Sequence, residues 1–189
     1  MSDPVSALGN ASDESGLVSI HELGPVGMIT LRGDLSDKGL MKAVKAVAGV
    51  DVPGQRAAAF EGDSGAVWMS PDELLVLCAY ADVPSKLAGL QERLSGMHAL
   101  AVNVSDARAV FELRGAAVRD VLAKVAPVDL SPEAMPPGMP RRTRFAQVPA
   151  AFWLVAEGHA RVICFRSVTQ YMLDLLRTVS RPGSEVDHF

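Results

Sequence analysis

Aromatic residues and cysteines are scarce in this chain of 189 residues. Aromatic residues make up 5% of it and hydrophobic residues 49%, so we expect an aliphatic core with Trp68 and Trp153 as its large anchors. The two cysteines, Cys78 and Cys164, each lie inside an apolar run that is typical of a strand. There is no CxxC pair and no Cys/His cluster, so we predict buried thiols and neither a disulfide nor a metal site.

The sequence also lacks a long apolar run and an excess of basic charge. No run approaches the roughly 18–20 apolar residues that span a bilayer, and the polar, acidic N-terminus has no secretory signal pattern. A net charge of −4 argues against a nucleic-acid-binding face. We therefore expect a cytoplasmic protein that binds neither nucleic acid nor membrane. Residues 1–16 are expected to form a flexible arm, or a segment that orders on a partner, and residues 181–189 a flexible tail.

Signatures of catalysis and cofactor binding are missing as well. The chain has neither GxGxxG nor GxxxxGK[ST], and no serine-hydrolase or kinase motif. Asp72 and Glu73 are interpreted as a solvated hairpin tip, because adjacent carboxylates in a turn point apart. The histidines have no neighbour at metal-ligand spacing: His21, His98, His159 and His188. We predict no catalytic, cofactor-binding or metal-binding residue in this chain.

The strongest positive signal is an internal repeat. The tripeptide Leu-Arg-Gly occurs at residues 31–33 and 113–115, and a Val-Asp-aliphatic triplet follows each copy at residues 50–52 and 128–130. The tripeptides are 82 residues apart, the triplets 78 and the two tryptophans 85. Loop insertions between duplicated elements produce such drift, and two copies are too few for a solenoid.

The repeat predicts an α+β fold, a single pseudo-symmetric domain over residues 17–180 with halves at about 26–96 and 99–180. In each half, apolar patterns of period 2 and period 3.6 alternate in the order β-α-β-β-α. The first helix is expected to begin at Ser36, a good N-cap residue, and to end at Gly49.

Arginines are concentrated in the second half and are the most informative polar residues. One interpretation is solvated or intra-domain ion pairs, a second is docking onto an acidic partner, and a third is binding of a small anion. We predict that five of them dock a partner or fix the domain's own loops: Arg108, Arg114, Arg142, Arg144 and Arg166.

An ordered series of motifs resembles a known family. The motifs are WMSPDELL at 68–75, SDARAVFELRG at 105–115, VRDVLAK at 118–124, PVDL at 127–130, RTRFAQV at 142–148, Trp153, and FRS at 165–167. Over residues 27–177 the chain is similar to the gamma subunit of heterotetrameric sarcosine oxidase. It departs from that family at Lys124-Val-Ala-Pro127, where a Lys-Gly-Cys-Pro-like turn is expected, and at the last helix, where Tyr171 has no Trp nearby.

The resemblance implies a small subunit without a cofactor of its own. The bacterial complex would oxidatively demethylate sarcosine to glycine, giving hydrogen peroxide and formaldehyde or 5,10-methylene-tetrahydrofolate. FAD, FMN and NAD would belong to the alpha and beta subunits and zinc to the delta subunit, with alpha the chief partner of this chain. The implied fold is similar to the folate-binding aminomethyltransferase domain of the glycine cleavage T-protein. No position here matches that domain's folate-binding motif, and a free-standing folate-binding one-carbon protein is the alternative.

Overall fold

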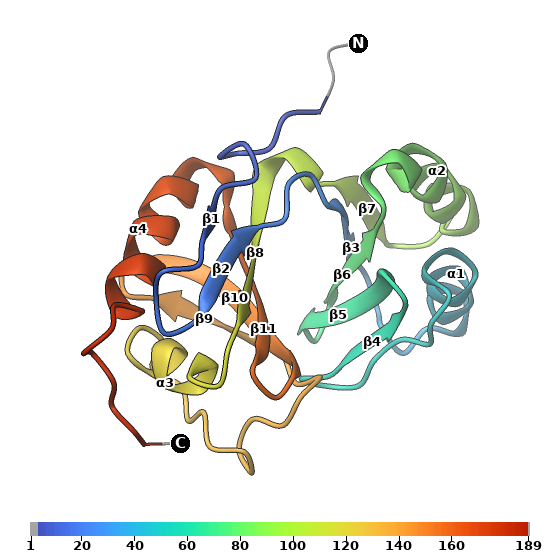
Figure 1. Ribbon diagram of the computed structural model, residues 1–189. Helices are drawn as coiled ribbons and strands as arrows, with labels where there is room; N and C mark the ends of the chain where they lie inside the picture. The colour runs from blue at the N-terminus through green and yellow to red at the C-terminus, as the bar shows by residue number, and fades with distance from the viewer. Residues whose placement is uncertain (1–3, 189) are drawn as a thin grey trace. The chain divides into compact units, whose positions relative to one another are not determined.

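The structure is a computed structural model that describes residues 4–188 (Figure 1). The chain forms two compact units: a terminal unit that joins Met1–Pro25 to Ala107–Phe189, and a central unit, Val26–Asp106. Each unit is an antiparallel sheet with its helices packed on one face, so the expected α+β class is confirmed. Within the described residues, no helix is long and apolar enough to cross a membrane.

The terminal unit contains a six-stranded sheet in the order β1-β2-β8-β11-β10-β9. Its strands are β1 (Ser12–Asp13), β2 (Ser19–Glu22), β8 (Arg108–Arg114), β9 (Arg141–Phe145), β10 (Val148–Ala156) and β11 (His159–Phe165). Its helices are α3 (Val118–Ala123) and α4 (Thr169–Val179), with the 3-10 turn η3 (Arg166–Val168) leading into α4. The apolar faces of both helices and one face of the sheet form the core, in which Phe145 and Phe152 meet edge to face.

The central unit contains a five-stranded sheet in the order β4-β5-β6-β3-β7. Its strands are β3 (Gly27–Arg32), β4 (Ala58–Glu61), β5 (Ser64–Ser70), β6 (Glu73–Cys78) and β7 (Leu100–Asn103). Its helices are α1 (Lys38–Ala48) and α2 (Val83–Arg93), and two 3-10 turns lie at Tyr80–Asp82 (η1) and Ser105–Ala107 (η2). Both helices pack on one sheet face around a separate aliphatic core.

Helix α1 begins one residue later than the sequence predicts. Asp37 is the N-cap, and its carboxylate accepts hydrogen bonds from the backbone N–H groups of Gly39 (2.7 Å) and Leu40 (3.0 Å). Ser36 as N-cap is therefore wrong, because its hydroxyl donates to Asp34 in the preceding turn. The helix ends at Gly49 as predicted, in the left-handed conformation (φ 81°) that glycine adopts without strain.

Two strands, β2 and β7, do not pair with the strand that follows them in the chain. β2 precedes β3 in the chain but pairs with β8, and β7 precedes β8 but pairs with β3 (Figure 1). The units therefore differ from the expected halves at 26–96 and 99–180. β7, expected in the second half, belongs to the central unit, and β2, which precedes both expected halves, belongs to the terminal unit. An apolar period identifies a strand but does not determine which sheet edge accepts it.

The two tryptophans do not occupy equivalent positions in the repeat. Leu74 pairs with the leucine of the first Leu-Arg-Gly and with Trp68, whereas Ala160 pairs with the leucine of the second copy and with Leu154. Trp68 therefore corresponds to Leu154, and Trp153 lies one residue away on the opposite sheet face. Trp153 is buried, as predicted, but Trp68 is only partly buried. The offset of 85 residues is thus wrong as a measure of the repeat.

The N-terminal segment differs from the expected flexible arm. β1 pairs with β2, and the buried carboxylate of Glu22 accepts hydrogen bonds from Ser6 Oγ (2.7 Å) and from the backbone N–H groups of Ala7 (3.0 Å) and Asn10 (2.9 Å). Residues 1–3 and 189 lie outside the described residues. In the expected tail, residues 181–188 contain no helix or strand.

Candidate functional site

Two of the five predicted docking arginines lie on β9, at the edge of the six-stranded sheet. Phe145 on the same strand points into the helix-side core, so the alternation of a strand places Arg142 and Arg144 on the other face, where both are exposed. Arg144 lies opposite Pro149 of β10. The structure therefore brings Arg142 and Arg144 together on an exposed edge.

Arg108 belongs to the same end of the same sheet face. It lies opposite Phe165, and Phe165 follows the pair formed by Cys164 and Ala150. Because neighbours in register share a face, Arg144, Pro149, Phe165 and Arg108 form one row across β9, β10, β11 and β8. We call these four residues the Phe165 row. Arg144 and Pro149 are exposed, Phe165 is 50% exposed, and Arg108 is half-buried.

Arg114 lies at the other end of β8 and binds within the chain. Its Nε donates to Glu112 Oε2 (2.8 Å), and Glu112 Oε1 lies 2.7 Å from His159 Nε2. Burial alone would raise the pKa of Glu112, but the hydrogen bonds and positive charge of Arg114 and His159 outweigh it, and the pKa of this carboxyl is lowered. Arg114 therefore orders a local network.

Arg166 fixes the N-terminal segment. Its guanidinium donates to the backbone carbonyls of Val5 (2.8 Å) and Ser6 (3.1 Å). This is the loop-fixing role that the sequence interpretation allowed beside docking, and it ties η3 to a segment that lies 160 residues away in the chain.

Arg119 is the internal anchor that the site prediction omitted. It is 6% exposed, and its Nε and Nη2 donate hydrogen bonds to the two carboxylate oxygens of Glu157 at 3.0 and 2.6 Å. Its Nη1 donates to the carbonyls of Leu130 (2.6 Å) and Met135 (3.2 Å). One guanidinium therefore holds the Pro-rich loop after α3 against the β10–β11 hairpin. The available signal was its position three residues before the apolar Leu122, which places the two residues on one face of α3.

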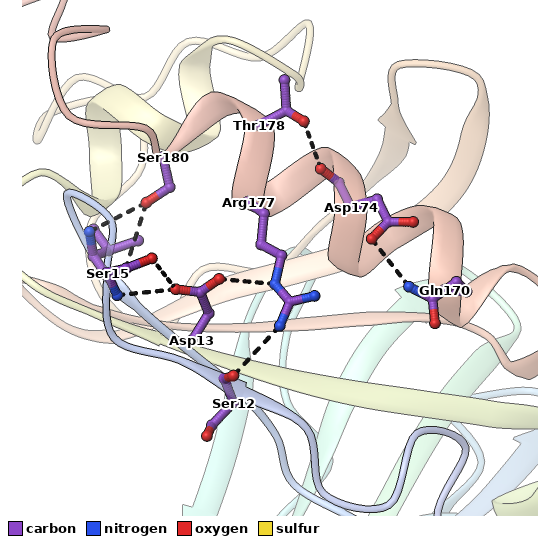
Figure 2. A network of polar contacts seen from close by, with 9 residues as sticks. Ser12, Asp13, Ser15, Gln170, Asp174, Arg177, Thr178 and Ser180 are labelled. Atoms are coloured by element: carbon purple, nitrogen blue, oxygen red, sulfur yellow. Dashed lines mark hydrogen bonds and ion pairs between the residues drawn. The ribbon is translucent and has the colours of Figure 1, made fainter.

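Arg177 connects the C-terminal helix to the N-terminal hairpin. Figure 2 shows its guanidinium between the Asp13 carboxylate, which its Nε reaches at 2.8 Å, and the Ser12 carbonyl. The hydroxyl and backbone N–H of Ser15 donate to Asp13, and together with Arg177 they lower the pKa of Asp13. At the end of α4, the Ser180 carbonyl accepts from Leu17 N at 2.6 Å. We use the name terminal clasp for the residues that make these contacts: Ser12, Asp13, Ser15, Leu17, Arg177 and Ser180.

The two cysteines and the carboxylate of Glu73 are buried. Burial raises the pKa of Cys78 and raises that of Cys164 to about 12, so neither thiol supplies a thiolate near neutral pH. Asp72 is exposed, but Glu73 is 3% exposed and binds Arg32 at 2.9 Å, so the prediction that Glu73 is solvated is wrong. Among the described residues, no three His, Cys, Asp or Glu side chains are placed to hold a metal ion.

Comparison with solved structures defines the fold. The chain matches a chain of heterotetrameric sarcosine oxidase from Corynebacterium sp. U-96, solved in complex with pyrrole 2-carboxylate, with a TM-score of 0.84 over 97% of this chain and 98% of that one, at 23% identity. It matches the glycine cleavage system aminomethyltransferase T from Bartonella henselae with a TM-score of 0.62 over 82% of this chain and 44% of that one, at 11% identity. The expected aminomethyltransferase-like fold is confirmed.

Sequence comparison then gives the family. The profile of the sarcosine oxidase, gamma subunit family matches residues 32–181. A sarcosine oxidase subunit gamma from an Arthrobacter species is 32% identical over 148 residues, which is 74% of this chain and 71% of that one. This chain belongs to the sarcosine oxidase gamma subunit family, and the resemblance found in its motifs is confirmed.

Proposed function

We propose that this chain is a non-catalytic structural subunit of a heterotetrameric sarcosine oxidase. The observation that carries the proposal is the family match over residues 32–181, in a chain whose fold matches one sarcosine oxidase chain almost end to end. The complex would oxidatively demethylate sarcosine to glycine, with formaldehyde or 5,10-methylene-tetrahydrofolate and hydrogen peroxide as products. Its location would be the cytoplasm.

The polar side chains of the described residues support a structural role. Arg119, Arg166 and Arg177 each join segments that are distant in the chain, and the cysteines are buried thiols of raised pKa. Chemistry would therefore belong to companion subunits, with FAD, FMN and NAD in alpha and beta and zinc in delta. Alpha would be the chief partner of this chain.

Co-expression tests the proposal. A tagged copy of the chain is produced together with the candidate alpha, beta and delta subunits, captured through its tag, and sized. We expect a yellow complex of four subunits with sarcosine-dependent oxygen uptake.

A colourless lone monomer would contradict the proposal. In that case calorimetric titration of the chain with tetrahydrofolate tests the alternative, a free-standing folate-binding one-carbon protein. Heat of binding would favour that alternative.

A further inference from the structure

The Phe165 row combines the side chains that anchor protein interfaces. The chain has six phenylalanines, and of the five described, Phe165 is the exposed one, because Phe111, Phe145 and Phe152 are fully buried and Phe60 is partly buried. Phenylalanine and arginine are both enriched at protein interfaces relative to the rest of the protein surface. Half of the Phe165 side chain is exposed, so its ring is available for contact with a partner.

The surroundings of Phe165 make a continuous surface. Pro149 lies between Phe165 and Arg144 in the row, so an apolar stretch spans β10 and β11. Arg144 borders it on β9 and Arg108 borders it on β8, directly opposite Phe165. The next row inward contains Ala151 and Ile163, which are 5% and 3% exposed, so the exposed apolar stretch ends there.

Charge indicates what this surface fits. Arg144 places an exposed guanidinium beside this apolar stretch, and no residue of the row carries a carboxylate, although the whole chain has a net charge of −4. A partner of matching chemistry would present an apolar pocket for Phe165 with carboxylates at its rim.

We propose that the Phe165 row is the docking surface for an acidic-rimmed apolar pocket on a companion subunit, an inference that rests on the proposed function. Phe165 is the anchor that fills the pocket, and Arg144 pairs with a rim carboxylate. Arg114 and Arg166, from the same predicted set, serve the chain's own network and N-terminal segment instead.

A competition assay tests the proposal. Two copies of this chain with different tags, one wild type and one variant, are co-expressed with the companion subunits, and the assembled complex is analysed for its content of each tag. We expect the Phe165→Ala copy to occupy less than about a tenth of the complexes, a loss typical of an interface anchor. The Arg144→Glu copy is expected to occupy several-fold fewer complexes than the wild-type copy. Its share should recover in part as salt is raised, because the reversed charge is then screened.

Tyr171→Ala is the matched control. Tyr171 is 43% exposed and lies on α4, on the opposite side of the same sheet from Phe165. We expect its copy to share the complexes equally with wild type. Thermal unfolding of each free variant checks that folding is unchanged.

The outcomes separate the two proposals. If the wild-type copy itself does not assemble with the companions, the proposed function fails. If wild type assembles and the Phe165→Ala and Arg144→Glu copies compete as well as it does, the docking surface is assigned to the wrong place. If the Tyr171→Ala and Phe165→Ala copies were excluded from the complexes to the same extent, the proposed docking surface would also be wrong.

Discussion

At the scale of single residues, we expect the hydrogen bonds of Arg119 to contribute to the stability of the terminal unit. Arg119→Met keeps the apolar stem on α3 but removes the donor to the carbonyls of Leu130 and Met135. Glu157 is 62% exposed and would be rehydrated at little cost, so the penalty comes mainly from the buried carbonyls. We expect unfolding free energy to fall by about 2–3 kcal/mol, measured by urea unfolding.

Arg93→Met is the control for this experiment. Arg93 is exposed on α2 and donates to Gly89 within its own helix. A surface substitution of this kind changes stability by less than about 0.5 kcal/mol. If Arg119→Met were no more destabilising than Arg93→Met, the anchoring role of Arg119 would be wrong.

Glu112 gives the terminal unit an acid-sensitive contact. The pKa of Glu112 in the folded chain lies below the ordinary value of 4.5. The contact with Arg114 and His159 therefore contributes its full stabilisation of the folded state when the pH is above that ordinary value. That stabilisation is lost as the pH falls through the lowered pKa, because the unfolded chain takes up the proton more readily. We expect Glu112→Gln to melt at a lower temperature than wild type at pH 7 and to lose less stability between pH 5 and pH 3. Melting curves across this range check it, and parallel pH profiles would refute it.

At the scale of elements, the terminal clasp depends on close approach of two backbones. A Cβ on Gly16 would lie 2.7 Å from the Ser180 carbonyl oxygen, which is closer than real side chains pack. Gly16→Ala should therefore push the β1–β2 connection away from α4 and cost about 1–3 kcal/mol. Gly54→Ala is the matched control, because nothing lies within 4 Å of the added carbon there, and it should be neutral or slightly stabilising. Equal effects of the two changes on the melting temperature would disprove the steric argument.

Sequence patterns predicted most elements because those elements depend on local signals. Gly49 ends α1. The two apolar runs on either side of the Pro71-Asp72 turn form the predicted antiparallel pair of β5 and β6. Local patterns could not predict that β2 pairs with β8 and β7 with β3, since many edges accept the same strand. The same limit applies to the site. The concentration of arginine in the second half identified Arg144 and Arg166 together, but only tertiary contacts separate an exposed arginine from one that holds Val5 and Ser6.

At the scale of the whole molecule, the terminal unit is assembled from both ends of the chain, whereas the central unit is continuous. The N-terminal contribution is substantial, because Val18 and Ile20 are 2% and 1% exposed in the core that α3 and α4 cover. Burial of each such side chain stabilises by about 1.5–3 kcal/mol, and β2 adds its ladder with β8. Stability of the terminal unit therefore depends on residues that precede the central unit in the chain.

Deletion of residues 1–25 tests this dependence. It removes β1, β2 and the Glu22 carboxylate that holds the N-terminal segment, and it leaves β8 as a sheet edge. Backbone amides of β8 should then exchange with solvent much faster, while those between β3 and β6 keep their protection, because every strand of the central sheet is still present. Hydrogen exchange followed by mass spectrometry resolves the two sets of amides, and the central unit serves as the control within the same molecule. Uniform loss of protection would mean that the two units unfold as one, and unchanged protection in β8 would mean that the N-terminal strands contribute little to the terminal core.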